Sequence, residues 1–276
     1  MKDLDFNNIL TDTLATFKNY WKPLMLIALI STAISIVFQG LMLIVPITSL
    51  RIVGVNSYLF LSLVITLTLW IINLYFVSRL SVTLISSAND AYNGNQVAIR
   101  HSYKEAKYNT GRYIGYSILT GIITFIPLMM LGLYNFNLFR VPRPTERIIM
   151  ALIGGTIAFL LHVALQFVPF ITVLGKRDES VIEKSFQIVR QKYIKVALLT
   201  LLPIVLSMPI WVIDKIPYFS QFELSAQGIK LLLTAIFTIG ITPFVSLYQL
   251  NIFKRLVEEE SQETEMQEME DSLYLR

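Results

Sequence analysis

The chain has 276 residues, of which 54% are hydrophobic and 15% are charged, and its formal net charge is +4. Soluble domains have about 25% charged residues, so this composition excludes an ordinary soluble protein and indicates a membrane protein. Because the chain has no cysteine and two histidines, disulfides, thiolate metal sites and multi-histidine metal sites are excluded as well.

Six long stretches of the chain contain no Lys, Arg, Asp or Glu. Each reaches the roughly 17 to 25 residues that a helix needs to cross a bilayer, whereas a transmembrane barrel would show short alternating segments. The sequence therefore predicts an all-α, polytopic membrane domain over residues 1–255. Its six transmembrane helices are expected at about 24–45, 57–78, 113–134, 148–174, 196–213 and 231–253.

The first hydrophobic run could be mistaken for a signal peptide. It begins only after Trp21, its approach carries Asp3, Asp5 and Asp12, and no small-x-small cleavage site follows it closely. We therefore expect it to be retained as the first span.

A cationic amphipathic stretch precedes the first, third and fifth predicted spans, at residues 14–22, 102–113 and 185–195. Lys18, Lys107 and Arg190 occupy equivalent places in these stretches. The pattern predicts three repeated units, each made of an amphipathic cytoplasmic helix followed by a transmembrane hairpin.

These amphipathic helices have two possible placements. They could lie in the headgroup plane, where each cation gains roughly 1 kcal/mol from anionic lipid, or they could continue the following span with their cations snorkelling. The sequence leaves both open. In either case the cations beside the spans are candidate contacts for lipid headgroups: Lys18, Lys107, Arg112, Arg190 and Lys195.

Two local signals mark helix ends near these stretches. Asn93-Gly94-Asn95 can end the long helix of the second span and cap the next one. In the third unit, Ser180 and Glu183 have the spacing of a capping box. Beyond it, apolar or small residues share one helical face: Val181, Ile182, Ser185, Phe186, Val189 and Tyr193.

The distribution of Lys and Arg predicts how the chain is threaded. Cations are retained on the cytoplasmic side of membrane proteins, and most of the Lys and Arg residues fall on the side that carries both termini. Both termini are therefore expected to be cytoplasmic, and the expected anionic partner is the membrane surface rather than nucleic acid. The cations expected on the other side are Arg51, Arg140, Arg143, Arg147, Lys215 and Lys230.

Residues 256–276 are strongly acidic, and Arg276 is the one base among them. This composition predicts a short helical extension that frays into a disordered cytoplasmic tail. The alternative is a docking segment for a basic protein partner or for the chain's own basic helices.

His162, Gln166 and Asn73 are the candidate polar site inside the predicted spans. His162 and Gln166 are four residues apart and share one helical face, where a proton relay or a polar substrate contact could form. No predicted span carries a carboxylate that could exchange protons with His162, so we favour an interhelical hydrogen bond.

Prolines interrupt spans three to six, which is compatible with ordinary packing or with the broken helices of transporters. They are Pro127, Pro169, Pro203, Pro209 and Pro243. The chain has no nucleophile elbow, phosphate-cradling glycine loop or His-Glu-x-x-His helix. We therefore expect no catalytic residues, no cofactor and no metal.

Three segments together resemble the YciC-like family of uncharacterised bacterial inner-membrane proteins. They are NILTDTL at 8–14, GNQVAIR at 94–100 and ALQFVPFITVL at 164–174. More distantly, the chain is similar to the membrane domain attached to some glycerophosphodiester phosphodiesterases, a domain that lacks their catalytic residues. The resemblance implies a multi-pass protein of the bacterial inner membrane and supplies no catalytic residues.

The sequence thus predicts a non-catalytic inner-membrane protein in envelope or lipid-related homeostasis, or a membrane scaffold. The alternative is a small transporter or channel. A cavity that reaches His162 and Gln166 would favour transport, a filled centre would favour a scaffold, and lipid bound at the cationic residues would favour a lipid role.

Overall fold

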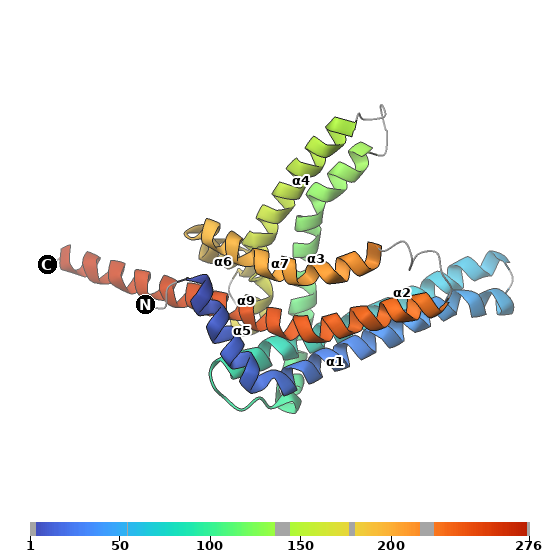
Figure 1. Ribbon diagram of the computed structural model, residues 1–276, viewed down its shortest axis with the longest axis horizontal. Helices are drawn as coiled ribbons and strands as arrows, with labels where there is room; N and C mark the ends of the chain where they lie inside the picture. The colour runs from blue at the N-terminus through green and yellow to red at the C-terminus, as the bar shows by residue number, and fades with distance from the viewer. Residues whose placement is uncertain (1–3, 54, 136–143, 177–179, 216–223, 275–276) are drawn as a thin grey trace. The chain divides into compact units, whose positions relative to one another are not determined.

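The structure is a computed structural model in which the backbone is described for residues 4–53, 55–135, 144–176, 180–215 and 224–274. Side chains are described for these residues except 43, 45–59, 128, 130–135, 144, 147, 210–215, 224–230 and 262–274. The described chain is helical (Figure 1). Its helices are α1 (Phe6–Val53), α2 (Val55–Tyr92), α3 (Ile99–Asn135), α4 (Pro144–Leu165), α5 (Val168–Leu174), α6 (Val181–Arg190), α7 (Tyr193–Lys215) and α9 (Leu224–Tyr274).

Four described helical segments are long and apolar enough to cross a membrane: Phe6–Met42, Phe60–Tyr92, Ile148–Leu174 and Leu231–Ser261. A fifth candidate is the bent pair Val181–Arg190 and Tyr193–Pro209. The chain therefore has the architecture of a helical membrane protein, as its composition predicted. The expected six spans are only partly matched, because α3 is not among these candidates.

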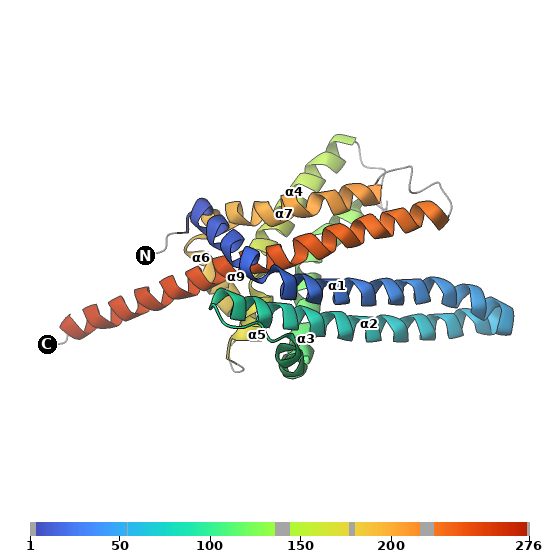
Figure 2. The ribbon, with the colours of Figure 1, turned by 60° about the horizontal axis from the view of Figure 1, so that its bottom comes forward.

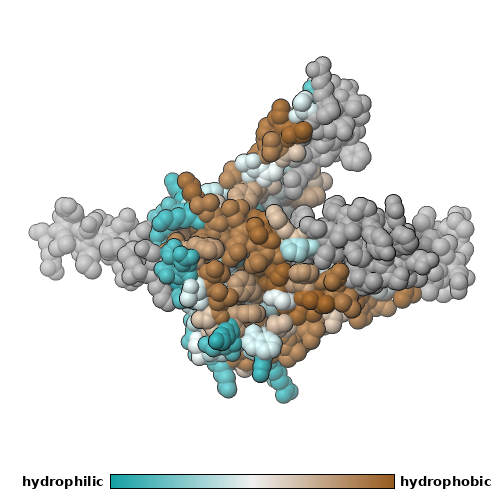
Figure 3. All heavy atoms as spheres, viewed as in Figure 1, coloured by the Kyte–Doolittle hydropathy of each residue, from teal (hydrophilic) through white to brown (hydrophobic). Residues whose placement is uncertain are grey.

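The apolar residues of the described chain are largely on its surface. Figure 3 shows hydrophobic side chains over most of the described surface that faces the viewer. Phe60, Leu63 and Leu152 are each more than 60% exposed on α2 and α4. Such an extensive apolar surface suits contact with lipid and is rare on a soluble monomer.

The three cationic stretches differ in structure. The first two continue into the following segment as one uninterrupted helix, α1 and α3. The third forms a separate helix, α6, which is bent by 107° from α7. The described backbone thus continues through the first two stretches as one helix and bends sharply after the third.

By internal contacts the chain divides into two compact units. Unit 1 comprises Met1–Thr11, Gly115–Leu202 and Gln249–Arg276, and unit 2 comprises Asp12–Ile114 and Pro203–Tyr248.

In unit 2, α1 and α2 form a long hairpin and run side by side in both ribbon views, as Figure 2 shows most clearly. Arg79 of α2 joins the start of α3 to this hairpin. Its Nη2 donates to the carbonyl oxygen of Tyr103 at 3.1 Å, and its guanidinium carbon lies 4.0 Å from the centre of the Tyr103 ring. Arg79 therefore has a structural contact within the protein.

The predicted end of the second long helix is confirmed at Gly94. The amide of Asn95 donates to Asp90 O at 2.8 Å and that of Gly94 to Ala91 O at 3.1 Å, which are the two bonds of a Schellman motif. Gly94 has a φ of +72°, which an L side chain rarely adopts.

The core of unit 1 includes an aromatic cluster and a buried polar chain. Phe167 and Phe170 contact Phe253 of α9, with ring centres 5.8 and 5.9 Å from it. Two residues after Phe253, Arg255 Nε donates to Asn251 Oδ1, one turn earlier in α9, at 3.1 Å. Asn251 Nδ2 in turn donates to the carbonyl oxygen of Ile9 at 3.2 Å. These contacts hold the N-terminal residues of the unit against α9.

Two details of α6 differ from the sequence prediction. Ser180 is the N-cap residue but makes no side-chain capping bond, so the predicted capping box does not form. Phe186 is 44% exposed, and Ile188 is buried instead. The reason is that positions 181, 185 and 188 form the face that packs on α4 and α5, which turns Phe186 outward.

Candidate functional site

A cavity of about 440 Å³ lies within unit 1, bounded by α3, the α4–α5 junction and α9. Its apolar wall is formed by Phe125, Leu165 and Pro169, and Gly121 leaves part of the wall without a side chain. The other described lining residues are polar, and none is Lys, Arg, Asp or Glu. They are Ser117, Thr120, Thr124, His162, Gln166 and Gln249.

The α3 side of the cavity is one helical face. Ser117, Thr120, Gly121 and Thr124 are separated by three or four residues, which places them in one row along the helix. The Thr120 hydroxyl lies 2.9 Å from Tyr116 O, to which it donates, so its polar group is satisfied within the helix. A Cβ atom at Gly121 would have no atom within 4 Å, so this glycine borders open space.

The opposite wall depends on a helix break at Pro169. Proline cannot donate to the carbonyl oxygen of Leu165, four residues earlier, and its ring crowds the preceding turn. Helix α4 accordingly ends at Leu165 and α5 begins at Val168. Pro169 thus lies at an interruption of its helix, as the sequence predicted. Pro127, Pro203, Pro209 and Pro243 instead lie inside continuous helices. His162, Leu165, Gln166 and Pro169 all line the cavity on either side of this break.

Gln166 is the most constrained polar group of the cavity. It is 7% exposed, and its Oε1 accepts a hydrogen bond from Thr200 Oγ1 of α7 at 3.0 Å. Its Nε2 is buried and has no hydrogen-bond partner among the described residues. An unmatched buried amide nitrogen of this kind costs about 1–3 kcal/mol, and its lack of accessible surface means that a molecule in the cavity does not contact it in this conformation.

The structure brings together two of the three predicted intramembrane polar residues. His162 and Gln166 line the same cavity, together with Gln249 of the last helix. Asn73 belongs to unit 2, where its Oδ1 is buried without a described partner. Among the described lining residues no carboxylate accompanies His162, so the cavity offers hydrogen bonds rather than a carboxylate–histidine relay.

Sequence reasoning missed the hydroxyl residues of α3. The sequence does show three hydroxyl residues on one helical face of an apolar segment, namely Ser117, Thr120 and Thr124. This pattern was easily overlooked because Ser and Thr hydroxyls in membrane helices usually bond to the preceding turn, as Thr120 does.

The candidate headgroup contacts are accessible. Lys18, Lys107, Arg190 and Lys195 are exposed, and Arg112 is half-buried. The exposed apolar side chains of Phe186 and Ile194 lie near Arg190 and Lys195 in the chain. Cations beside exposed apolar groups suit the boundary between headgroups and acyl chains.

Other cations of the third unit pair with the acidic C-terminal segment. Lys184 of α6 lies 3.1 Å from Glu260, and Lys192, between α6 and α7, forms an ion pair with Glu259. Helix α9 continues through this segment to Tyr274, beyond the short extension that composition predicted. Glu, Gln and Met are good helix formers, and no Pro or Gly interrupts them. Glu259 and Glu260 therefore contact basic residues of the same chain, which is one of the two docking alternatives that the sequence suggested for this segment.

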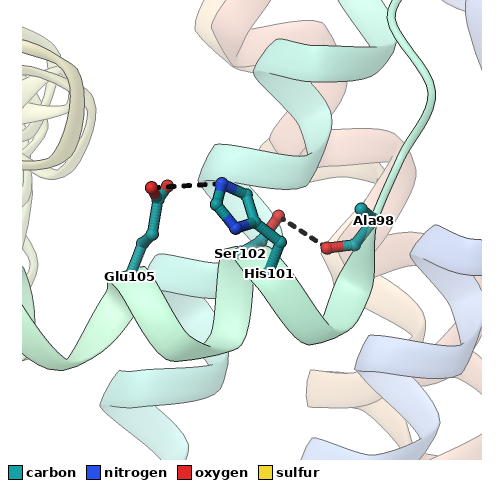
Figure 4. Close-up of polar contacts among 4 residues, drawn as sticks. All are labelled: Ala98, His101, Ser102 and Glu105. Carbon is teal, nitrogen blue, oxygen red and sulfur yellow. Dashed lines mark hydrogen bonds and ion pairs between the residues drawn. The ribbon is translucent and has the colours of Figure 1, made fainter.

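A histidine–carboxylate pair lies at the start of α3 (Figure 4). His101 Nε2 is 3.1 Å from Glu105 Oε1, and both side chains are more than half exposed. Next to it, the buried Ser102 donates to Ala98 O at 3.3 Å, which anchors the first turn. In the part of the chain that the structure describes, no three His, Asp or Glu side chains are grouped to hold a metal ion.

No protein-family model matches the chain, and no match is found among curated proteins or among solved structures.

Proposed function

We propose that this chain is an integral protein of the bacterial inner membrane that binds a lipid or lipid-like molecule in the cavity of unit 1. Its role would be in envelope or lipid-related homeostasis, and it would catalyse no reaction. The resemblance of residues 8–14, 94–100 and 164–174 to the YciC-like family supports this placement.

The observation that carries the proposal is the cavity itself. Its volume of about 440 Å³ falls within the range of small-molecule sites, and its lining combines an apolar wall with a few polar groups. His162 and Phe125 are exposed at its edge, so the cavity is not sealed by the unit.

Binding is proposed rather than catalysis because of the chemistry of the lining. General acid–base catalysis needs a positioned proton donor or acceptor whose pKa is tuned by its neighbours. The described lining provides amides, hydroxyls and one imidazole, with no carboxylate beside it. These groups orient a neutral ligand by hydrogen bonding.

The test is native mass spectrometry of the purified protein in lipid nanodiscs, comparing two variants. Gly121→Phe places a large side chain in the cavity, where a Cβ atom meets nothing within 4 Å. Gly115→Phe is the matched control, because Gly115 is also on α3 with open space around it but does not line the cavity. We expect retained lipid in the wild type and in Gly115→Phe, and its loss in Gly121→Phe. Equal retention in all three would overturn the proposal.

A small transporter or channel is the second candidate. The broken α4–α5 helix beside the cavity and the 107° bend between α6 and α7 favour it, because transporters form their sites at interrupted helices. Flux measurements in proteoliposomes distinguish the two. Solute movement that Gly121→Phe abolishes and Gly115→Phe preserves would favour transport.

A further inference from the structure

Four polar side chains of the cavity have no hydrogen-bond partner among the described residues. They are Ser117, Thr124, His162 and Gln249. Each residue is exposed or half-buried, and none of their polar atoms is among the fully buried ones, unlike Gln166 Nε2. A molecule in the cavity can therefore form hydrogen bonds with them in the observed conformation.

The contacts at the end of α9 show how deep two of these groups lie. Phe253 is the last residue of the charge-free stretch 231–253, and its ring centre is 5.9 Å from that of Phe170. Gln249 precedes Phe253 by four residues, and His162 precedes Phe170 by eight. At 1.5 Å per residue they lie roughly 6 and 12 Å deeper than this ring pair. His162 is one residue from the middle of the candidate span Ile148–Leu174, so the cavity reaches the centre of that span.

Helix α3 lines the cavity over a similar length. Ser117 and Thr124 are seven residues apart on one face, which is roughly 10 Å along the helix. The surface of α3 beside this row is apolar, and Ile118, Ile122 and Phe125 are 45%, 54% and 56% exposed. A polar path and an apolar surface thus lie side by side on one helix. This arrangement suits a lipid whose headgroup enters the cavity while its acyl chains remain in the bilayer.

The headgroup is what opposes the movement of a phospholipid from one leaflet to the other. A polar group without a partner is costly in hydrocarbon, and a charge is most costly at the bilayer centre. His162 offers hydrogen bonds at that depth. The described lining has no Lys, Arg, Asp or Glu, so it provides no counter-charge for an anionic headgroup. A zwitterionic headgroup, with a net charge of zero, suits this path better.

From these observations we infer that the headgroup of a zwitterionic phospholipid passes through the cavity to the middle of the membrane, so that the protein exchanges lipids between the two leaflets. The inference rests on the proposed function, because it assigns a use to lipid binding in the same cavity. The chain has no phosphate-cradling glycine loop, so the exchange is passive.

The experiment measures lipid exchange by the full chain reconstituted in unilamellar vesicles. The probe is phosphatidylcholine with a nitrobenzoxadiazole fluorophore on one acyl chain, and external dithionite bleaches the outer leaflet alone. Vesicles without protein should lose only the outer-leaflet signal, whereas vesicles with the protein should lose nearly all of it. Phosphatidylglycerol with the same fluorophore should exchange at least about threefold more slowly, because the lining has no cation.

Two pairs of variants test whether the cavity is the path. Gly121→Phe fills the cavity and should abolish exchange, whereas Gly115→Phe should preserve it because Gly115 does not line the cavity. His162→Leu should slow exchange about fivefold, the effect of losing one hydrogen bond. His101→Leu is its control, because His101 is exposed and does not line the cavity.

The outcomes separate this inference from the proposed function. A wild-type protein that retains lipid in native mass spectrometry but exchanges none would overturn the inference alone. Neither retained lipid nor exchange would overturn both. Phosphatidylglycerol that moves as fast as phosphatidylcholine would contradict the assigned headgroup class.

The remaining outcomes concern the path itself. Undiminished exchange in Gly121→Phe would rule out passage through the cavity. If Gly121→Phe does not fold, equal rates in His162→Leu and His101→Leu would do so instead. Bleaching of a water-soluble fluorophore inside the vesicles would show that dithionite enters, which would refute lipid exchange and favour a channel.

Discussion

Ser185 of α6 donates a hydrogen bond from its Oγ to the carbonyl oxygen of Ala164, 2.7 Å away at the end of α4. The two residues are buried, Ser185 completely. Ala164 lies between His162 and Gln166 in the chain, so this bond ties the amphipathic helix to the wall of the cavity. It also gives a partner to a carbonyl oxygen where Pro169 breaks the helix.

Replacing Ser185 by alanine should therefore destabilise unit 1. The change Ser185→Ala leaves a buried carbonyl oxygen without its donor and should lower the free energy of unfolding by about 1–2 kcal/mol. Denaturant unfolding in detergent micelles measures it. Ser180→Ala is the control, because the Ser180 side chain makes no capping bond. Equal stability of the two variants would contradict the role of the Ser185 bond.

The ion pair between Lys192 and Glu259 should couple the start of α7 to the acidic segment. Its side chains are 25% and 11% exposed, so solvent screens it only in part. A double-mutant cycle with Lys192→Gln and Glu259→Gln should give a coupling of about 1 kcal/mol that falls as salt is raised. The same cycle with the exposed Lys195 in place of Lys192 should give none. A coupling unchanged between low and high salt would argue against an ionic contact.

Asn251 should determine how firmly the N-terminal residues are held. It accepts from Arg255 Nε and donates to Ile9 O, so Asn251→Leu removes both bonds and deprives the buried Arg255 of an acceptor. We expect a loss of about 2–4 kcal/mol, since buried groups deprived of partners are costly. Limited proteolysis should then cleave the chain near residue 9 sooner. The exposed Asn7→Leu is the control and should be cleaved at the wild-type rate.

Features set by local backbone chemistry were predictable from the sequence. Gly94 ends α2 because only glycine readily adopts the left-handed conformation that the Schellman motif requires. Pro169 lies at a helix break, where its missing amide proton contributes, but Pro127, Pro203, Pro209 and Pro243 lie inside continuous helices, so a proline alone does not predict a break. His162 and Gln166 share one face because they are four residues apart, and both line the cavity.

Features that depend on packing partners were not predictable from the sequence. Phe186 looked like a buried residue of α6, but the face that meets α4 and α5 passes through Ser185 and Ile188. The cationic stretches predicted to be equivalent differ: α1 and α3 continue as one helix each, whereas α6 and α7 form a bent pair in which α6 packs on α4 and α5. The α3 hydroxyls became part of a site only through the helices opposite them.

The last prediction concerns the side of the membrane on which the C-terminus lies. Six spans would place both termini in the cytoplasm, as the Lys and Arg distribution predicts, whereas the five candidate spans that exclude α3 would place them on opposite sides. A green fluorescent protein fused after Arg276 should therefore fluoresce, and alkaline phosphatase fused there should be inactive. Alkaline phosphatase fused after Arg143, in the connection predicted to be external, should be active and serves as the control. An active phosphatase at Arg276 would favour the odd number of spans.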